Sequence, residues 1–286
     1  MGPIAPLGFS SYVSKIAHYS NQYKVPLGQS IKLSEIDPNE IATLDLENSG
    51  VLNELFKSNR RQIHELQRVL GAESKHALLI IIQGMDACGK DRAIRRVLCI
   101  NPKGLQVTSF RAPSEKERKH DYLWRIHKDI PEYGSIGVFH RSHYEDVIPT
   151  WVKDKISKDV LELRYEQINS FEKYLSENNI KIIKFYFHMS NEEQLKRLIE
   201  RRDNPRKHFK LSINDFEERK LWDKYIGAYE QAITKCNTPW APWFVIPANN
   251  KLFKDLVFSQ IVLETLQGLN MKYPPPPIDP NVIDIG

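Results

Sequence analysis

The 286-residue chain is poor in cysteine and has no segment suited to a membrane or to export. Its three cysteines, Cys88, Cys99 and Cys236, cannot all pair and lie in no CxxC or Cys/His spacing, which indicates reduced thiols rather than disulfides or zinc sites. The longest purely apolar run spans Ala77 to Ile82, far short of the roughly 20 residues of a membrane-spanning helix. The N-terminus has no charged segment followed by an apolar stretch. We therefore expect a soluble, cytoplasmic protein that binds no membrane.

Charged and apolar residues are present in ordinary amounts. Charged residues make up 27% and hydrophobic residues 41%, which excludes a disordered, collagen-like or coiled-coil chain. Lys and Arg number 41 and Asp and Glu 36, an excess of five that hints at an anionic partner but is small for a nucleic-acid binder. Residues 196–210 contain seven Lys or Arg and two acids, so this one segment accounts for the whole excess. We expect no nucleic-acid partner.

Short apolar segments alternate with longer segments of helical spacing. Ala77 to Gln83 suits a strand that is buried on both faces of a parallel sheet. Further strands are predicted at 106–110, 135–139, 181–187 and 243–247, and helices at 114–128, 160–178, 191–202, 215–235 and 251–267. This alternation predicts an α/β fold of three layers, with a mainly parallel central sheet and helices on both faces.

We expect a single domain over residues 1–286. Residues 1–44, rich in Pro and Ser, would form an ordered arm or a partner contact. Residues 45–72 predict an amphipathic helix, whose apolar face would pack either on the core or on another copy in a dimer or tetramer. A catalytic core over 77–268 would be followed by an extended tail over 269–286, which contains four consecutive prolines.

Residues 84–90 read GMDACGK, which matches GxxxxGK between a predicted strand and a helix that begins near Ile94. Glycines in such a loop let backbone N–H groups face a phosphate, and the lysine reaches the outer phosphates; the alternative is a plain tight turn. Asp91 stands where Ser or Thr usually binds Mg²⁺, and Asp86 lies inside the loop, which suggests that carboxylates hold the ion here. Alternatively, Asp91 is only a favourable acid at a helix N-terminus. The phosphate-binding residues predicted here are Gly84, Ala87, Cys88, Gly89, Lys90, Asp91 and Arg92.

A second polar group follows the predicted strand 135–139. Its sequence, HRSHYED over residues 140–146, lies at the carboxyl end of the strand, where open α/β sheets bind ligands. An acid there would orient Mg²⁺ against phosphates, and Arg141 would bind phosphate with two N–H groups. Ser142 and Glu145 also fit a capping box, a purely structural role.

The basic segment 196–210 is interrupted by Pro205, so its second half is expected to be a mobile loop or a short helical flap. Such a run of charge is commonly just a solvated surface. If it binds a polyanion, the residues predicted to do so are Arg201, Arg202, Arg206, Lys207 and Lys210.

Together these segments resemble the polyphosphate kinase 2 family, in particular the members that transfer phosphate from polyphosphate to AMP or ADP. The resemblance is carried by QGMDACGKD (83–91), SFRAP (109–113), HDYLWRIH (120–127), GVFHRSHYEDV (137–147), RRDNPRKHFKLSINDFEER (201–219) and WAPWFVIPANNK (240–251). YKVPLG (23–28) and YPPPPIDP (273–280) are similar too, so that the resemblance covers nearly the whole chain.

The resemblance implies a P-loop kinase fold and a reversible, Mg²⁺-dependent transfer of the terminal phosphoryl group of polyphosphate to AMP or ADP, with Mn²⁺ as a substitute ion. It implies that Asp86 and Asp146 hold the metal ion and that Lys90, Arg141 and Glu145 complete the catalytic group. The implied nucleotide contacts are Arg111, Asp121, Arg125, Arg141, His143, Tyr144 and Glu145. A lid over about 201–215 would close on the polyphosphate. The implied partners are inorganic polyphosphate, AMP, ADP and ATP, in a homo-oligomer.

Four positions depart from the family pattern. Arg92 replaces a glycine, His140 an Asn or Asp, Asn204 the second Asp of a DDP triplet, and Phe209 a Trp. Arg92 is expected to crowd the loop, because close approach of backbone to phosphate favours small residues.

The chemistry of phosphate transfer fits the residues independently. An anionic phosphate acceptor needs no Ser/His/Asp or Cys/His nucleophile, and none is apparent in the sequence. Two other functions stay open: an ATP-dependent kinase for a nucleotide or small molecule on the same fold, and a non-catalytic polyanion or nucleic-acid binder. The second lacks the interleaved aromatic residues of a base-stacking surface.

Overall fold

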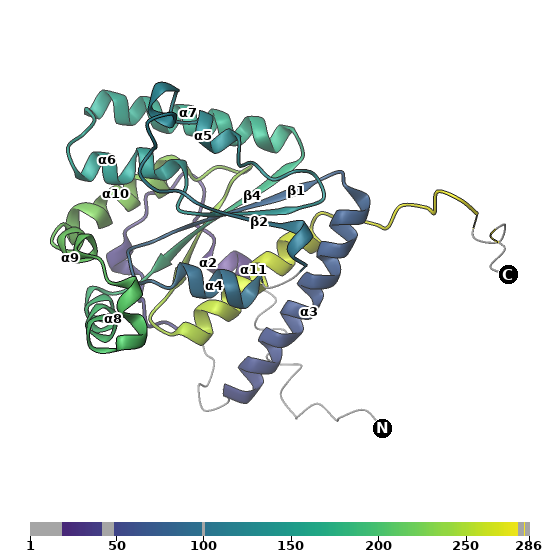
Figure 1. Ribbon diagram of the computed structural model, residues 1–286, viewed down its shortest axis with the longest axis horizontal. Helices are drawn as coiled ribbons and strands as arrows, with labels where there is room; N and C mark the ends of the chain where they lie inside the picture. Colours follow the sequence, from purple (N-terminus) through teal and green to yellow (C-terminus); the bar gives the residue numbers. More distant parts are fainter. Residues whose placement is uncertain (1–18, 42–48, 99–100, 280–282, 284–286) are drawn as a thin grey trace.

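The computed structural model describes residues 19–41, 49–98, 101–279 and 283. Five strands form one sheet in the order β2-β3-β1-β4-β5, and every neighbouring pair is parallel. The strands are β1 (Ala77–Gln83), β2 (Leu105–Ser109), β3 (Ile136–His140), β4 (Ile180–His188) and β5 (Trp243–Pro247). Helices cover both faces of this sheet (Figure 1), which confirms the predicted three-layer α/β fold.

Helices connect the strands and extend the chain at both ends. The α-helices are α2 (Tyr19–Tyr23), α3 (Ser49–Glu73), α4 (Lys90–Val97), α5 (Trp124–His127), α6 (Ile148–Val152), α7 (Lys158–Glu177), α8 (Asn191–Asp203), α9 (Ile213–Arg219), α10 (Trp222–Lys235) and α11 (Lys251–Gln267). Short 3₁₀ helices lie at η1 (Leu33–Glu35), η3 (Pro102–Gly104), η4 (Glu117–Lys119), η5 (His143–Asp146) and η6 (Pro205–Lys210).

One face of the sheet is covered by α3, α4 and α11. Leu78, Ile80 and Ile82 of β1 point into this core, where they join buried residues of the three helices. The long helix α3 lies beside α11 (Figure 1), and its apolar side is part of the same core. The amphipathic pattern of this helix is thus satisfied within the chain.

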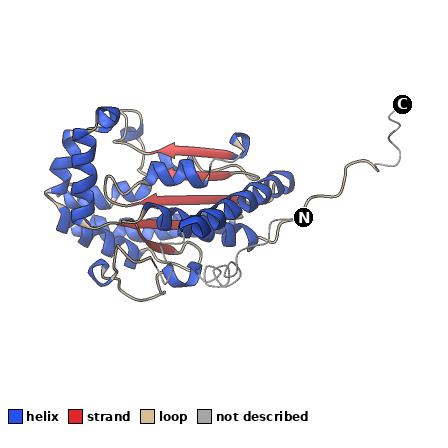
Figure 2. Cartoon of the chain, turned by 90° about the horizontal axis from the view of Figure 1, so that it is seen from below, coloured by secondary structure: helices blue, strands red, loops and turns tan. Residues whose placement is uncertain are grey.

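The opposite face is covered by α6, α7 and α10. Leu79 and Ile81 of β1 point into this second core. All seven residues of β1 are buried, as expected for a continuously apolar strand between two helical layers. Figure 2 shows that the strands run in one direction, so their carboxyl ends meet at one edge of the sheet.

Two predicted helices differ from the structure. Only η4 and α5 are helical within 114–128, because Asp121 accepts hydrogen bonds from the backbone N–H groups of Leu123 (3.0 Å) and Trp124 (3.1 Å) and starts a new short helix there. The predicted helix 215–235 is divided into α9 and α10. Residues of α10 are buried against the sheet, whereas none of α9 is buried, so the two parts do not share one apolar face.

The described N-terminal segment packs on the rest of the chain, whereas the C-terminal tail leaves it. Residues 19–41 pack on their own chain: Val25 N donates to Trp243 O (2.9 Å), and Leu33 N donates to Glu230 Oε1 (2.7 Å). At the start of the tail, Leu269 and Met271 pack against the core, and the hydroxyl of Tyr273 donates to Glu65 Oε1 (2.9 Å). Beyond this contact the tail runs away from the body (Figure 1). The remainder of the predicted arm, residues 1–18 and 42–44, lies outside the described residues. Across the described ranges, no helix combines the length and apolar character that a membrane crossing requires.

The cysteines agree with the expectation of reduced thiols as far as they are described. Cys88 and Cys236 are buried and unpaired. Cys99 lies outside the described residues.

Candidate active site

A cavity of about 540 Å³ opens at the carboxyl ends of β1 and β3. Its wall combines charges of both signs: the cations are Arg111, Arg118, Arg125, Arg141, Lys153 and Lys155, and the acids are Asp86, Glu145, Asp146, Asp215 and Glu218. This is the edge where parallel α/β sheets bind ligands. A wall with both arginines and carboxylates suits a polyanion that arrives with a metal ion.

The loop after β1 is shaped by its glycines. Gly84 has φ 145° and Gly89 has φ 94°, and residues with a Cβ atom rarely adopt such positive values. A Cβ atom on Gly84 would also lie 2.9 Å from both Cys88 Sγ and the carbonyl oxygen of Phe187. Gly89 is followed directly by α4. The predicted order of strand, loop and helix N-terminus is therefore present, as a phosphate loop requires.

Lys90 keeps a positive charge inside this loop. Its side chain is buried, and Nζ donates to the carbonyl oxygens of Gly84 (2.7 Å) and Met85 (3.2 Å). The loop residues on the cavity wall are Gly84, Met85 and Asp86, whereas those from Ala87 to Arg92 do not reach it.

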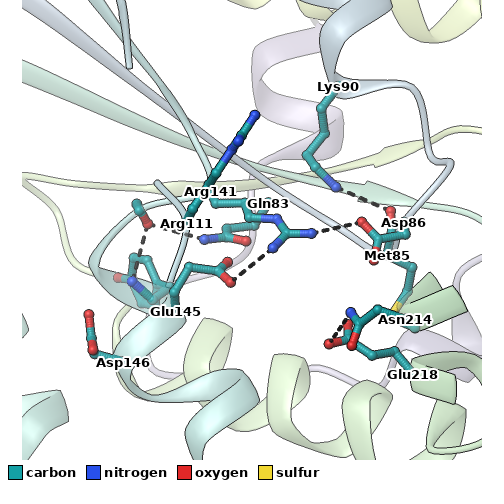
Figure 3. A network of polar contacts seen from close by, with 12 residues as sticks. Gln83, Met85, Asp86, Lys90, Arg111, Arg141, Glu145, Asp146, Asn214 and Glu218 are labelled. Carbon is teal, nitrogen blue, oxygen red and sulfur yellow. Dashed lines mark hydrogen bonds and ion pairs between the residues drawn. The ribbon is translucent and has the colours of Figure 1, made fainter. Parts of the chain in front are cut away.

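Arg141 connects the loop with the turn after β3. One of its N–H groups donates to Asp86 (3.0 Å), and the guanidinium also lies 3.8 Å from Glu145 (Figure 3). Its backbone has φ 63°, a left-handed conformation at the point where β3 ends. The two motifs that the sequence places 50 residues apart thus meet at one arginine.

The pKa values of Asp86 and Glu145, the two acids around Arg141, are shifted in opposite directions. Burial favours the neutral form of Asp86, but Lys90 and Arg141 outweigh it and hold the pKa of Asp86 below its ordinary value. Burial raises the pKa of Glu145 despite the opposing charges of Arg141 and Lys90. Asp86 is therefore the more firmly ionised of the two.

The raised pKa of Glu145 makes a testable prediction. An ionised carboxylate with a raised folded-state pKa lowers stability at neutral pH, so Glu145→Gln should shift the midpoint of urea unfolding at pH 7 upward. This gain should shrink as the pH falls through the raised pKa, because wild-type Glu145 is then protonated. Activity should fall by about 10²-fold, since Arg141 loses a charged partner that orients it. A variant less stable than the wild type at pH 7 would contradict this reading.

Asp146, the second predicted metal ligand, is held by another arginine. The buried Arg125 donates to Asp146 Oδ2 (2.9 Å) and to the carbonyl oxygen of Arg111 (2.7 Å). Within the described part of the chain, no three His, Cys, Asp or Glu side chains gather as metal ligands. Mg²⁺ commonly takes only one or two carboxylates and completes its shell with phosphate oxygens and water. The donors Asp86 and Asp146, both on the cavity wall, fit such an ion.

His143 and Tyr144 are predicted to contact the nucleotide, and the structure does not bring them to the cavity. Both side chains are fully buried and reach Glu172 on α7 instead. They belong to the 3₁₀ helix η5, in which successive residues point in different directions, so Glu145 and Asp146 face the cavity while their neighbours face the core. Asp121 likewise lies off this wall and accepts the backbone N–H of Leu123, whereas Arg111 and Arg125 line the wall.

Glu172 is the centre of a buried charged network. It accepts hydrogen bonds from Tyr144 OH (3.0 Å) and Lys184 Nζ (2.5 Å), and His143 Nε2 lies 3.1 Å from it. Lys184 also donates to Tyr144 OH (3.0 Å) and to the carbonyl oxygen of Cys236 (2.6 Å). The network joins η5 to α7 and β4 and thereby positions the turn that carries Glu145 and Asp146.

The predicted capping box is only half formed. Ser142 Oγ accepts the backbone N–H of Tyr144 (3.2 Å), one residue earlier than the motif requires. Glu145 turns its carboxylate to Arg141 rather than back to the cap.

Arg92 and Asp91 lie outside the cavity. The expectation that Arg92 crowds the loop is wrong: its side chain turns towards α11, where Nε lies 3.5 Å from Asp255 Oδ2. Asp91 is exposed in the first turn of α4 and lies 3.3 Å from Nε2 of His140, in agreement with a helix N-terminal acid. Burial lowers the pKa of His140 to about 4, so this histidine is neutral at pH 7.

The predicted lid, residues 201–215, consists of the end of α8, η6 and the start of α9. Figure 1 places α8 and α9 at the cavity end of the sheet. Arg201 donates to Asp215 (2.8 Å), while the basic residues predicted to bind polyphosphate, Arg201, Arg202, Arg206, Lys207 and Lys210, do not line the cavity wall. Asn204 caps η6 by accepting the backbone N–H of Arg206 (3.0 Å), and Phe209 is 80% exposed.

Several cavity residues were not predicted from the sequence. Gln194 donates to the carbonyl oxygen of Asp86 (3.1 Å), and Lys153 donates to Glu218 (2.6 Å), which ties α9 to the end of α6. Other unpredicted residues of the wall include Arg118, Thr150, Lys155, Asn214, Asp215, Tyr225 and Tyr229. Asn214 and Glu218 lie within the segment 201–219 that carries the family resemblance, which is a signal that could have identified them.

The chain is similar to several known proteins. The family model for polyphosphate kinase 2 matches residues 47–274. An AMP/ADP-polyphosphate phosphotransferase of Meiothermus ruber is 43% identical over 256 residues, 89% of this chain and 96% of that protein. An ADP-polyphosphate phosphotransferase of Rhodopseudomonas palustris is 39% identical over 272 residues and is 92% covered.

A solved structure gives the same result for the fold. The crystal structure of polyphosphate kinase 2 from Arthrobacter aurescens superposes with a TM-score of 0.87 and 38% identity, over 91% of this chain and 93% of that one. Because the family model spans residues 47–274 and these relatives align along most of their length, the chain belongs to the polyphosphate kinase 2 family.

Proposed function

We propose that the protein transfers the terminal phosphoryl group of inorganic polyphosphate to AMP or ADP. One observation carries the proposal: Arg141 joins the phosphate loop to Glu145 on the wall of a cavity with six cationic and five acidic side chains. The relatives named above, one of them an AMP/ADP-polyphosphate phosphotransferase, support this choice of substrates.

The residues of the chain suit an in-line transfer. An oxygen of the acceptor phosphate attacks the terminal phosphorus of polyphosphate, the P–O bond to the chain breaks, and the shortened chain keeps the electron pair. No proton has to move, so a general base is not required. The loop N–H groups and Lys90 would hold the transferred group, and Arg141 would neutralise charge between the two anions.

Mg²⁺ belongs to this proposal. Asp86 and Asp146 would hold the ion, which supplies charge neutralisation at the phosphates when bound. Mn²⁺ would serve in its place, because it accepts the same oxygen ligands.

Two expectations about the setting of the protein are part of the same proposal. A cytoplasmic location fits the nucleotide substrates. The homo-oligomer rests on the family resemblance alone, because the apolar face of α3 is covered within the chain.

An assay of donors and acceptors tests the proposal. The purified protein is given long-chain polyphosphate, Mg²⁺ and each adenine or guanine nucleoside mono- and diphosphate in turn, with ATP as the donor in a parallel series. We expect ADP from AMP, or ATP from ADP, with polyphosphate as donor, and a loss of both in EDTA. Transfer from ATP but not from polyphosphate would favour the ATP-dependent kinase, and salt-sensitive RNA binding without transfer would favour the polyanion binder.

A further inference from the structure

The phosphate loop is contacted from behind by Lys254, near the start of α11. The Lys254 side chain is fully buried, and Nζ donates to the carbonyl oxygen of Gly89 (2.9 Å). The same carbonyl accepts the backbone N–H of Ala93 (3.1 Å), the first helical hydrogen bond of α4. A Cβ atom on Gly89 would lie 2.8 Å from Nζ, so a larger residue there would displace the ammonium group.

This contact fixes the direction of a phosphate-binding group. The C=O and N–H groups of a trans peptide point in opposite directions. Because the carbonyl of Gly89 points along α4 towards Lys254, the N–H group of Lys90 points the other way, out of the helix N-terminus. That is the direction in which such a loop receives a phosphate.

The ammonium group of Lys254 lies within an apolar core, next to an aromatic ring and a buried carboxylate. The ring of Phe187 lies 4.9 Å from Nζ, and Asp255 Oδ1 lies 3.5 Å away. Asp255 is itself fully buried, with Arg92 Nε at 3.5 Å and Arg96 Nε at 3.3 Å. One carboxylate therefore faces three cations, and the cluster retains positive charge behind the loop.

We propose that Lys254 is a positioning residue for the phosphate loop: it holds the Gly89 carbonyl so that the Lys90 N–H faces the bound phosphate. Asp255 supports this role, because it keeps the ammonium group of Lys254 in place and fastens α4 through Arg92 and Arg96. The inference rests on the proposed function in one respect, namely that the loop binds polyphosphate.

Three substitutions of Lys254 distinguish the effect of its hydrogen-bond donor from the effect of its packing. Lys254→Met keeps the length of the side chain but has no donor, Lys254→Gln restores a neutral donor, and Lys254→Arg restores a charged one. Binding of inorganic tripolyphosphate is measured by calorimetry, together with KM for polyphosphate, KM for ADP and kcat. Circular dichroism and thermal unfolding select the variants that remain folded.

We expect Lys254→Met to weaken tripolyphosphate binding and raise KM for polyphosphate by about tenfold, the effect of one charge-assisted hydrogen bond, while KM for ADP stays within about twofold. Lys254→Gln or Lys254→Arg should recover part of the loss. A folded Lys254→Met protein with wild-type affinity for tripolyphosphate would overturn the inference, as would Gln and Arg variants no better than Met. The calorimetric result does not depend on turnover, so it stands apart from a failure of the proposed activity.

The pH dependence provides a second readout. Burial lowers the pKa of Lys254 to about 8, with Asp255 on α11 and Cys88 in the loop opposing that shift and Arg197 on α8 adding to it. Arg92 and Arg96 on α4 face the same site through Asp255. In the wild type, the affinity for tripolyphosphate should fall as the pH rises through about 8. Lys254→Arg should lose this dependence, because a guanidinium stays charged. If the affinity of Lys254→Arg changed with pH in the same way as that of the wild type, the result would count against the inference.

Discussion

Replacing Lys90 with alanine is expected to lower kcat/KM for polyphosphate-dependent phosphorylation of ADP by about 10³-fold, the upper range for removal of one preorganised charge-stabilising donor. Lys90 is the cation that the loop encloses, with Nζ on the carbonyl oxygens of Gly84 and Met85. Without it, the loop offers only N–H groups to a chain of negative charges. Asp86→Ala is expected to cause a comparable loss, because Arg141 then loses its partner in the loop and one proposed metal ligand is absent.

The loss should concern activity and not folding. Lys90 Nζ donates to the loop carbonyls of Gly84 and Met85 and to Cys88 Sγ, all within the loop itself, so the unfolding midpoint of Lys90→Ala should stay near that of the wild type. Lys57→Ala is the control: this exposed lysine on α3 pairs with Glu54, and the variant should be as active as the wild type. Substantial transfer by a folded Lys90→Ala protein would refute the proposed role of the loop.

Replacing Lys184 with methionine is expected to destabilise the protein by about 3–5 kcal/mol, because a buried ion pair loses one partner. Lys184 and Glu172 are both fully buried and lie 2.5 Å apart. The free energy of unfolding is measured with urea. Lys181→Met, on the same strand but half-buried and not in this network, is the matched control and should lose far less.

The pH dependence of stability checks the same pair. Burial would raise the pKa of Glu172, but Lys184 and His143 outweigh it and hold that pKa below its ordinary value. A carboxylate with a lowered folded-state pKa contributes stability above the pKa of the unfolded chain, and this contribution is lost as the pH falls through the folded-state value. Lys184→Met should lack this contribution. Adding Glu172→Leu to Lys184→Met should recover stability, since no buried charge is then left unpaired; a double variant weaker than the single one would contradict the argument.

The strands and the two ligand motifs were predictable because their signals are local. The continuous apolar run of β1 can only be buried on two faces, and the glycines of residues 84–90 stand directly after it. The helix predicted at 114–128 failed although its signal was also local. There Asp121 supplies a side-chain cap in the middle of a helical pattern, and a cap outweighs periodicity over so short a segment.

The residues missed at the site are those whose role depends on distant partners. Lys184 sits in a strand and Glu172 in a helix, and no local pattern distinguishes them from surface residues until the fold brings them together. The prediction for Arg92 fails for the same reason: its partner Asp255 lies 163 positions later in the chain, beyond the reach of any local pattern. The resemblance implies that His143 and Tyr144 contact the nucleotide, but a 3₁₀ helix divides its residues between two sides and turns these two into the core.

The contact between Lys153 and Glu218 has a consequence for how the cavity responds to ionic strength. This pair, that of Arg201 with Asp215, and the hydrogen bonds from Arg219 to Asn191 and Gln194 of α8 hold α9 near the cavity. No side chain of α9 is buried. The side chains of these pairs are only 14–33% exposed, so salt screens them less than it screens pairs in full contact with water. As salt is raised, we expect the sheet and its two apolar cores to keep their arrangement and the attraction for a polyanion to weaken. Salt should therefore act mainly on the binding of an anionic substrate, with a smaller effect on the position of α9.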